Sequence, residues 1–261
     1  MKKILVTGGL GYIGSHTVVE LIDNDYDVTI VDNLANSDIS VLNKIEEISL
    51  VRPQFLQVDL CSYNDIENVF KSSSFDAVIH FAGLKAVGES VNKPLEYYDN
   101  NLTSTLNLLK LMNKYGVNNL IFSSSATVYG EQSSHELFEN MQTGVGVTNP
   151  YGRTKVMIEQ IIKDFTSANQ NFNSVILRYA NPIGAHSSSL IGENPNGIPN
   201  NLLPFIAQVA SGRRDRLNVF GDDYPTPDGT CIRDYIHVVD LAKGHTAALD
   251  LLNKSPKNKF N

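Results

Sequence analysis

A short apolar segment runs directly into a glycine-rich turn near the start of the chain, Ile4-Leu5-Val6-Thr7-Gly8-Gly9-Leu10-Gly11-Tyr12-Ile13-Gly14. The stretch from Val18 to Ile22 then places apolar side chains at helical spacing. The order of strand, glycine turn and helix is typical of a site for a dinucleotide pyrophosphate, because glycine lets the backbone approach the phosphates and the helix start offers free N–H groups. We therefore expect Gly8, Gly11 and Gly14 to form a phosphate cradle, although glycines of a purely structural turn are common.

Further short apolar segments recur along the chain, and amphipathic stretches of helical character lie between them. Continuous apolar strands joined by helices indicate a parallel sheet that is buried on both faces. The sequence thus predicts an α/β protein with a doubly wound parallel sheet of the Rossmann type. The expected strands are Ile4 to Thr7, Val28 to Val31, Phe55 to Val58, Ala77 to Phe81, Leu120 to Ser123, and Val175 to Leu177.

The composition changes after about residue 180, where Pro, Gly and Asn become frequent. Such a composition is typical of loops. We expect residues 1–180 to form the dinucleotide-binding domain and residues 181–261 a smaller, loop-rich substrate lobe, allowing that the two interleave. Because Lys259-Phe260-Asn261 reads as the beginning of a strand, we expect this lobe to be truncated.

Length and charge limit the classes of protein that fit. With 261 residues, 42% of them hydrophobic, the chain suits one globular protein. The net charge of −7 and the lack of a basic run argue against a nucleic-acid or membrane partner. No signal peptide or bilayer span is evident, and Cys61 and Cys231 favour free thiols, so we expect a cytoplasmic protein. Six scattered histidines predict no metal site.

Asp32 follows the second expected strand, eighteen residues after Gly14. A carboxylate there accepts hydrogen bonds from the adenosine ribose and repels a 2′-phosphate, which selects NAD over NADP. The alternative for Asp32 is an ordinary turn-forming aspartate.

A tyrosine and a lysine are the candidates for catalysis. Tyr151 and Lys155 are four residues apart in an expected helix, so they share one face. A tyrosine acts as a general base near neutral pH only if a cation stabilises its phenolate, and Lys155 can lower the pKa of Tyr151 in this way. Ser125 follows the fifth expected strand, at the edge where such sheets bind ligands. A solvated helix face and a plain serine-rich loop are the alternatives.

The glycine turn and the Tyr151/Lys155 pair together resemble the extended short-chain dehydrogenase/reductase superfamily. Longer strings narrow the resemblance to its UDP-glucose 4-epimerase family, and they span almost the whole chain. These strings are Asp32-Asn33-Leu34-Ala35-Asn36-Ser37, residues 80–90, Phe122-Ser123-Ser124-Ser125-Ala126-Thr127-Val128-Tyr129-Gly130, Gly197-Ile198-Pro199-Asn200-Asn201-Leu202, and Arg233-Asp234-Tyr235-Ile236-His237-Val238.

The resemblance implies an NAD-dependent isomerase that interconverts UDP-glucose and UDP-galactose through a 4-keto sugar, with Tyr151 as base, Lys155 holding the nicotinamide ribose and Ser125 on the sugar. It also implies a homodimer formed through helices around Asn100 to Tyr115 and Tyr151 to Phe165. The further NAD contacts that it implies are Tyr12, Ile13, Asp32, Asn33, Asn36, Ser37, Asp59, Leu60, Phe81, Ala82, Gly83, Lys85, Asn100 and Ala180. The further UDP-sugar contacts are Asn181, Asn201, Leu202, Asn218, Val219, Phe220 and Arg233.

Three features depart from the family pattern. Ala180 stands where an aromatic residue usually packs beside the nicotinamide, the segment from Ser133 to Val147 diverges, and family members continue beyond residue 261. Two alternatives stay open: a related nucleotide-sugar enzyme, and a non-catalytic NAD-binding remnant. A 4,6-dehydratase needs an acid pair after the fifth strand, and Ser125-Ala126-Thr127 supplies none.

Overall fold

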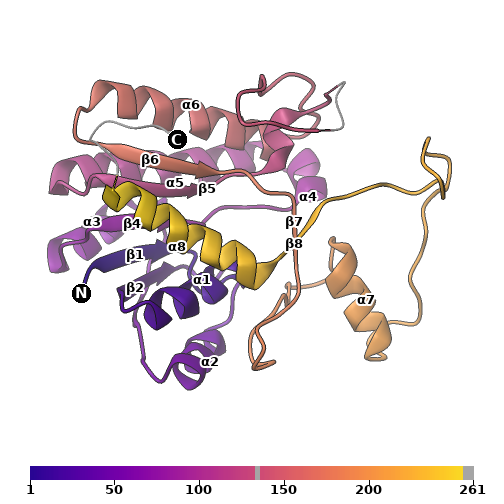
Figure 1. The fold of residues 1–261 in the computed structure, drawn as a ribbon, viewed down its shortest axis with the longest axis horizontal. Coiled ribbons are helices and arrows are strands. Elements are labelled where there is room, and N and C mark those ends of the chain that lie inside the picture. The colour runs from indigo at the N-terminus through magenta and orange to yellow at the C-terminus, as the bar shows by residue number, and fades with distance from the viewer. Residues whose placement is uncertain (133–135, 255–261) are drawn as a thin grey trace.

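A six-stranded parallel sheet forms the centre of the computed structural model, which describes residues 1–132 and 136–254 (Figure 1). The spatial order of its strands is β3-β2-β1-β4-β5-β6, and every neighbouring pair is parallel. This order is that of a doubly wound sheet, as predicted. The strands are β1 (Lys3–Thr7), β2 (Asp27–Asp32), β3 (Gln54–Gln57), β4 (Ala77–His80), β5 (Asn119–Ser123) and β6 (Asn173–Leu177).

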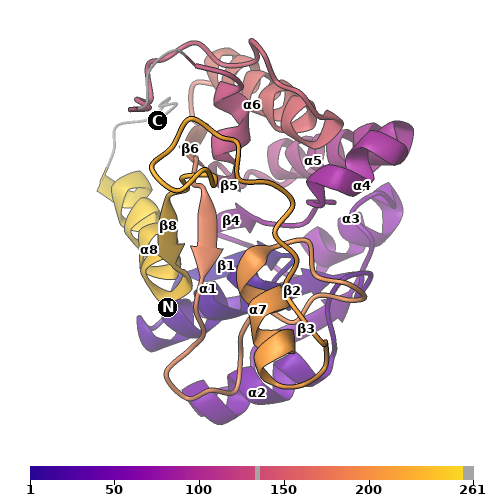
Figure 2. The ribbon, with the colours of Figure 1, turned by 90° about the vertical axis from the view of Figure 1, so that its right-hand side faces the viewer.

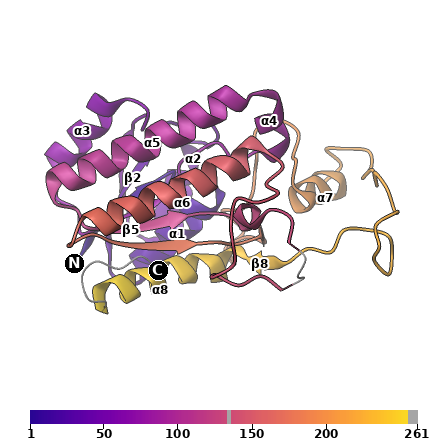
Figure 3. The same ribbon diagram turned by 90° about the horizontal axis from the view of Figure 1, so that it is seen from above.

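Helices cover both faces of the sheet, and each face has its own apolar core (Figure 3). One face is covered by α1 (Tyr12–Asp23), α2 (Ser40–Ser49) and α8 (Val238–Lys254). The opposite face is covered by α3 (Tyr63–Ser72), α5 (Pro94–Tyr115) and α6 (Pro150–Ala168). Burial on both faces explains why the strands are continuous apolar runs rather than alternating ones.

The order of the strands reverses between β1 and β4, where Thr7 pairs with His80. The chain leaves these two neighbours in opposite directions, so a crevice opens beyond their carboxyl ends, and open α/β sheets bind ligands there. The glycine turn follows β1 and the segment after β4 begins at Phe81, so both reach this crevice. Between β4 and α5 lies the short helix α4 (Val87–Asn92).

The segment between β6 and α8 projects beyond this edge of the sheet (Figures 1 and 2). It contains a parallel pair, β7 (Asn181–Ile183) with β8 (Tyr235–His237), and the helix α7 (Leu202–Ala210). Helix α8 then returns to the sheet and packs against α1. The division at residue 180 stays a prediction, and the expected strand at Lys259-Phe260-Asn261 lies outside the described residues.

All six predicted sheet strands are present, with ends within two residues of those expected. One boundary differs in an informative way: α1 begins at Tyr12, inside the glycine motif, rather than after Gly14. A side chain at position 14 would place its Cβ 2.2 Å from the Gly8 carbonyl oxygen. The first turn of the helix therefore packs directly on the glycine turn. None of the described helices combines the length and apolar character needed to cross a bilayer.

Candidate active site

The glycine turn leaves no space for side chains at its key positions. Gly8 has a φ of +71°, and a Cβ there would lie 2.8 Å from the backbone nitrogen of Ala82. Gly11 is the N-cap residue of α1, and no side chain caps the helix. The first N–H groups of α1 therefore remain available to an anionic group, as the chemistry of a dinucleotide pyrophosphate requires.

Asp32 ends β2 beside this turn, and its buried carboxylate has three donors. It accepts hydrogen bonds from Leu10 N at 3.1 Å, Leu34 N at 3.0 Å and Ser37 Oγ at 2.8 Å. The turn-forming role considered above is thus present, since Leu34 has a φ of +61° and is held by Asp32. The carboxylate also ties the end of β2 to the glycine turn, so its contact with a ribose stays a prediction.

The structure brings several of the predicted adenosine residues together. Asn33 Nδ2 donates to Asp59 Oδ2 at 3.3 Å, and the Cys61 thiol lies 3.6 Å from the Asn100 carbonyl oxygen. Leu60 is buried, whereas Asn36 is exposed, and its side chain has no hydrogen bond with another described residue. Both Cys61 and Cys231 are free thiols, as expected.

A buried asparagine that the sequence did not point to holds the segment from Phe81 to Lys85. Asn101 Oδ1 accepts from Leu84 N at 2.8 Å, and its Nδ2 donates to Leu84 O at 3.0 Å and to Thr154 Oγ1 at 3.1 Å. Asn101 lies on α5 and Thr154 on α6. This segment, which includes the predicted ligands Ala82, Gly83 and Lys85, is therefore fixed between two helices.

Lys155 lies on the buried face of α6, one turn from Tyr151. The helix begins as predicted, with Asn149 Oδ1 accepting from Gly152 N at 2.8 Å. Lys155 Nζ donates to the Ser123 carbonyl oxygen at 2.8 Å and lies 5.8 Å from the centre of the Tyr151 ring. Burial lowers the pKa of Lys155 to about 8, and the nearby charge of Glu159 acts in the opposite direction.

Tyr151 is half-buried, and burial raises the pKa of its phenol. A hydrogen bond with Ser125 opposes this rise. The expected lowering of the Tyr151 pKa by Lys155 is not found, because the ammonium group is directed to the Ser123 carbonyl rather than to the phenol oxygen. Ser125, not Lys155, is the group that favours the phenolate here.

Ser125 is held at the beginning of a short 3-10 helix, η1 (Ala126–Tyr129). Its Oγ accepts from Thr127 N at 3.2 Å and from Thr127 Oγ1 at 3.0 Å. Ala180 follows Tyr179, whose carbonyl accepts from Ala126 N at 2.9 Å, so Ala180 lies close to this serine turn. Three predicted site residues therefore come together at one edge of the sheet. They are Ser125 and Tyr151, predicted to act on the sugar hydroxyl, and Lys155, predicted to hold the nicotinamide ribose.

A buried ion pair beneath this edge was not foreseen from the sequence. Glu159 accepts from Arg178 Nε at 3.0 Å and Nη2 at 2.7 Å, and from Ser124 Oγ at 2.5 Å. Glu159 is four residues after Lys155 on the same helix. Oppositely charged residues four apart, such as Lys155 and Glu159, are usual on a solvated helix face. The sequence therefore gave no sign that Glu159 is buried.

His80 occupies the middle of the sheet below the crevice. Its Nδ1 lies 2.7 Å from Thr7 Oγ1 and its Nε2 lies 3.0 Å from Thr105 Oγ1. Burial lowers the pKa of His80 to about 3, and the charge of Lys155 acts in the same direction. His80 is therefore a neutral structural link between β1, β4 and α5.

The predicted UDP-sugar residues are divided among three places. Asn181 donates from its backbone and side chain to the Asp234 carbonyl, beside Arg233. Asn201 is the N-cap residue of α7, next to Leu202. Asn218, Val219 and Phe220 instead lie on the projecting loop, where Phe220 is 97% exposed and no described hydrogen bond joins them to the Tyr151 site.

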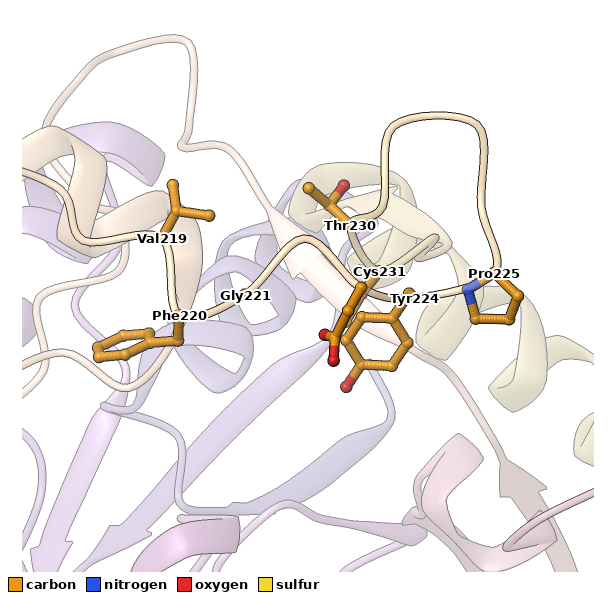
Figure 4. Close-up of a pocket in the computed structure, with 8 residues that line it drawn as sticks. Val219, Phe220, Gly221, Tyr224, Pro225, Thr230 and Cys231 are labelled. Atoms are coloured by element: carbon orange, nitrogen blue, oxygen red, sulfur yellow. The ribbon is translucent and has the colours of Figure 1, made fainter.

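That loop folds around a shallow hollow of about 580 Å³, shown in Figure 4. Tyr224 and Cys231 lie together on one side of it, and Phe220 lies apart from them (Figure 4). The residues that line the hollow belong to the projecting loop alone. It is thus separate from the crevice at Tyr151 and is not itself the candidate active site.

Comparison with known proteins assigns the family. A family model described as the NAD dependent epimerase/dehydratase family matches residues 4–261. The UDP-glucose 4-epimerase of Bacillus subtilis is 54% identical over 259 residues, which cover 99% of this chain and 76% of that protein. The chain belongs to this epimerase family. A UDP-glucose 4-epimerase of Mus musculus is also similar, at 55% identity over 97% of this chain and 75% of that protein.

Solved structures of UDP-glucose 4-epimerases have the same fold as this chain. The enzyme of Bifidobacterium longum, solved in complex with NAD+ and UDP, superimposes with a TM-score of 0.94 at 52% identity over 98% of this chain and 76% of that chain. An enzyme of Stenotrophomonas maltophila, solved with NAD and a formylated UDP-arabinopyranose, gives 0.93 at 48% identity over 97% and 75%. The chain spans about three-quarters of the length of these relatives.

Proposed function

We propose that this epimerase interconverts UDP-glucose and UDP-galactose by inverting carbon 4 of the sugar, with Tyr151 as the general base. The observation that carries this proposal is the convergence of Ser125, Tyr151 and Lys155 at the carboxyl edge of the sheet, beside the glycine turn. The identity of 54% to 55% with curated UDP-glucose 4-epimerases supports the same reaction.

NAD is the cofactor of the family, and the residues present fit it. The tight turn at Gly8 and the uncapped start of α1 suit the pyrophosphate, and Asp32 and Asn33 suit the adenosine. Lys155 and Tyr151 would hold the nicotinamide ribose, and Lys85 would contact the diphosphate. When bound, NAD would supply the hydride acceptor and donor for oxidation and reduction at carbon 4 of the sugar.

The side chains of the site move and hold one proton. Tyr151 takes the proton of the sugar 4-hydroxyl and later returns it, while Ser125 hydrogen-bonds both the phenol and the sugar oxygen. The buried ammonium of Lys155, fixed by the Ser123 carbonyl, provides a positive charge one helical turn away. Because Ser125 is the group that lowers the pKa of Tyr151 in the structure, the role proposed for this ammonium is to hold the nicotinamide ribose.

The sugar must turn over between the two hydride transfers, so it is the UDP part that has to be anchored. Asn181 and Arg233 would hold the diphosphate beside the β7–β8 pair. Asn201 and Leu202 would hold UDP from the start of α7. Arg233 is exposed, and its guanidinium donates only to the Ile232 carbonyl among the described residues. It is therefore available to a phosphate.

We also propose a homodimer and a cytoplasmic location. Leu106 on α5 and Met157 on α6 are exposed apolar residues on the two helices predicted to form the dimer. Replacing both with Glu should convert a dimer into a monomer in sedimentation equilibrium, and an unchanged mass would contradict this interface. The free thiols of Cys61 and Cys231 are typical of a reducing compartment.

The test is to incubate the purified protein with UDP-galactose and separate the products. Formation of UDP-glucose supports the proposal, and bound NAD with no conversion would identify a non-catalytic NAD-binding protein. The variant Tyr151→Phe should retain NAD and lose about 10²- to 10⁴-fold in kcat, the usual contribution of a general base. Activity of this variant near that of the unmodified protein would reject Tyr151 as the base.

A further inference from the structure

Glu193 lies where the projecting segment leaves the sheet. It follows a small β-bridge between Ala185 and Gly192, within which Ile191 is buried in the core beneath α1. The Tyr12 hydroxyl at the start of α1 donates to the Gly184 carbonyl at 2.7 Å. The backbone that carries Glu193 is therefore fixed to the cofactor half of the molecule.

One oxygen of Glu193 contacts residues from both predicted binding sites. Its Oε1 accepts from Asn201 Nδ2 at 2.7 Å and lies 3.6 Å from Lys85 Nζ. The Glu193 side chain is only 10% exposed, whereas that of Lys85 is 47% exposed. The ion pair with a half-exposed lysine contributes little in water, so the hydrogen bond to Asn201 is the stronger of the two interactions.

The bond to Asn201 matters because so little else holds α7. Among the described residues, it is the one hydrogen bond that joins residues 195–230 to the part of the chain before residue 195. Leu202, Leu203 and Ile206 on α7 are exposed and Pro204 is the one buried residue of the helix, so apolar packing holds the helix only in part. In Figure 2, α7 lies in front of the carboxyl edge of the sheet. The contact between Glu193 and Asn201 is the polar anchor of its first residues.

We propose that Glu193 is a positioning residue of the UDP-sugar site, which holds the Asn201 amide and the first residues of α7 beside the cofactor segment that carries Lys85. This inference rests on the proposed function, because it assumes that Asn201 contacts UDP. In this role Glu193 acts through Asn201 rather than by binding the sugar.

The chemistry of the two groups explains the choice of a carboxylate. An ionised carboxylate accepts hydrogen bonds and cannot donate, so it turns the NH2 group of Asn201 toward itself. One N–H of that amide is then used, and the second remains for a phosphate oxygen, which also only accepts. Glu193 therefore sets the orientation in which Asn201 can bind an anion.

The experiment compares Glu193→Ala with Glu193→Gln in the NAD-loaded protein. UDP binding is measured by titration calorimetry. Turnover is measured with UDP-galactose as the substrate. Loss of one positioning hydrogen bond should weaken UDP binding about tenfold in Glu193→Ala. KM should rise by about the same factor, with kcat within about threefold because Tyr151 is untouched. Glu193→Gln, whose side-chain carbonyl still accepts from Asn201, should bind UDP within about threefold of the unmodified protein.

A double-variant cycle separates positioning from a general structural effect. If Glu193 acts through Asn201, adding Glu193→Ala to Asn201→Ala should weaken UDP binding no further. The proposal would be overturned if Glu193→Ala lowered the UDP affinity by the same factor in the unmodified protein and in Asn201→Ala. Unchanged UDP binding in Glu193→Ala alone would also overturn it. If Glu193→Ala does not fold, Glu193→Gln still tests the proposal. A tenfold loss of UDP affinity in that variant would overturn the proposal as well.

The outcome for the unmodified protein distinguishes this inference from the proposed reaction. A protein that binds UDP but does not convert UDP-galactose would reject the reaction and leave the role of Glu193 testable by binding. A protein that binds no UDP would overturn both.

Discussion

The carboxyl edge of the sheet and the projecting segment differ in how their polar and apolar groups are held. At the sheet edge, Lys155, Glu159 and His80 are buried and each has a hydrogen-bond partner. In the projecting segment, Val219, Phe220 and Ile232 are exposed by more than two-thirds. The catalytic groups are thus fixed by the packing of the protein itself, whereas the substrate segment is held through a few anchors such as Glu193.

The largest difference between the regions is expected at the buried ion pair. Glu159→Ala removes the partner of Arg178, whose side chain is mostly buried, and leaves a guanidinium charge uncompensated. Breaking such a pair should lower the free energy of unfolding by about 3 to 5 kcal/mol, measured by urea denaturation. The matched control is Glu46→Ala, which breaks an exposed carboxylate–guanidinium pair with Arg52 and should cost less than about 1 kcal/mol. Equal losses would show that the buried network is not special.

A pair of glycine substitutions tests the tight packing of the cofactor turn. Gly14→Ala places a Cβ 2.2 Å from the Gly8 carbonyl oxygen and should destabilise the protein by about 1 to 3 kcal/mol and reduce its NAD content. Gly244→Ala on α8 meets no atom within 4 Å and should stabilise by about 0.5 to 1 kcal/mol, because alanine favours the helix. Thermal unfolding with NAD absorbance measures both effects. A stable, NAD-loaded Gly14→Ala protein would contradict the structure of the turn.

Acid should weaken the buried region first, through two histidines. Burial lowers the pKa of His80 to about 3 and that of His245 to about 4, below the unfolded value of about 6.5. The unfolded chain therefore binds more protons below pH 6.5, and stability falls as the pH falls toward 4. Each histidine contributes a slope of up to about 1.4 kcal/mol per pH unit. In His245→Leu the slope measured by urea denaturation between pH 6 and pH 4.5 should be smaller by this amount, and equal slopes would exclude the effect.

The smallest effect on stability is expected in the projecting loop. Phe220→Ala should change the free energy of unfolding by less than about 0.5 kcal/mol, because the ring is 97% exposed. Phe122→Ala, the matched change within β5, should cost about 3 to 5 kcal/mol. If Phe220 contacts UDP as predicted, its loss should still weaken UDP binding. A large loss of stability in Phe220→Ala would mean that this ring packs in solution.

The sequence predicted the sheet well because burial on both faces makes most of its strands largely continuous apolar runs. The glycine turn was also predictable, since strand, turn and helix are adjacent in the chain. The support beneath the site was not, because its partners are distant in sequence: Glu159 meets Arg178, and Asn101 meets Leu84 and Thr154. A lone charged residue such as Glu193 in a loop carries no local pattern that distinguishes it from a solvated one.

Helix α8 bears on how the chain folds during synthesis. Its residues Ala248, Leu249 and Leu252 belong to the same apolar cluster as Val18 and Val19 of α1. The part of that face covered by α8 therefore stays open until the late part of the chain has emerged from the ribosome, and contacts between such distant segments form slowly. Before residue 248 is made, a nascent chain has an open apolar face that is a natural target for chaperones.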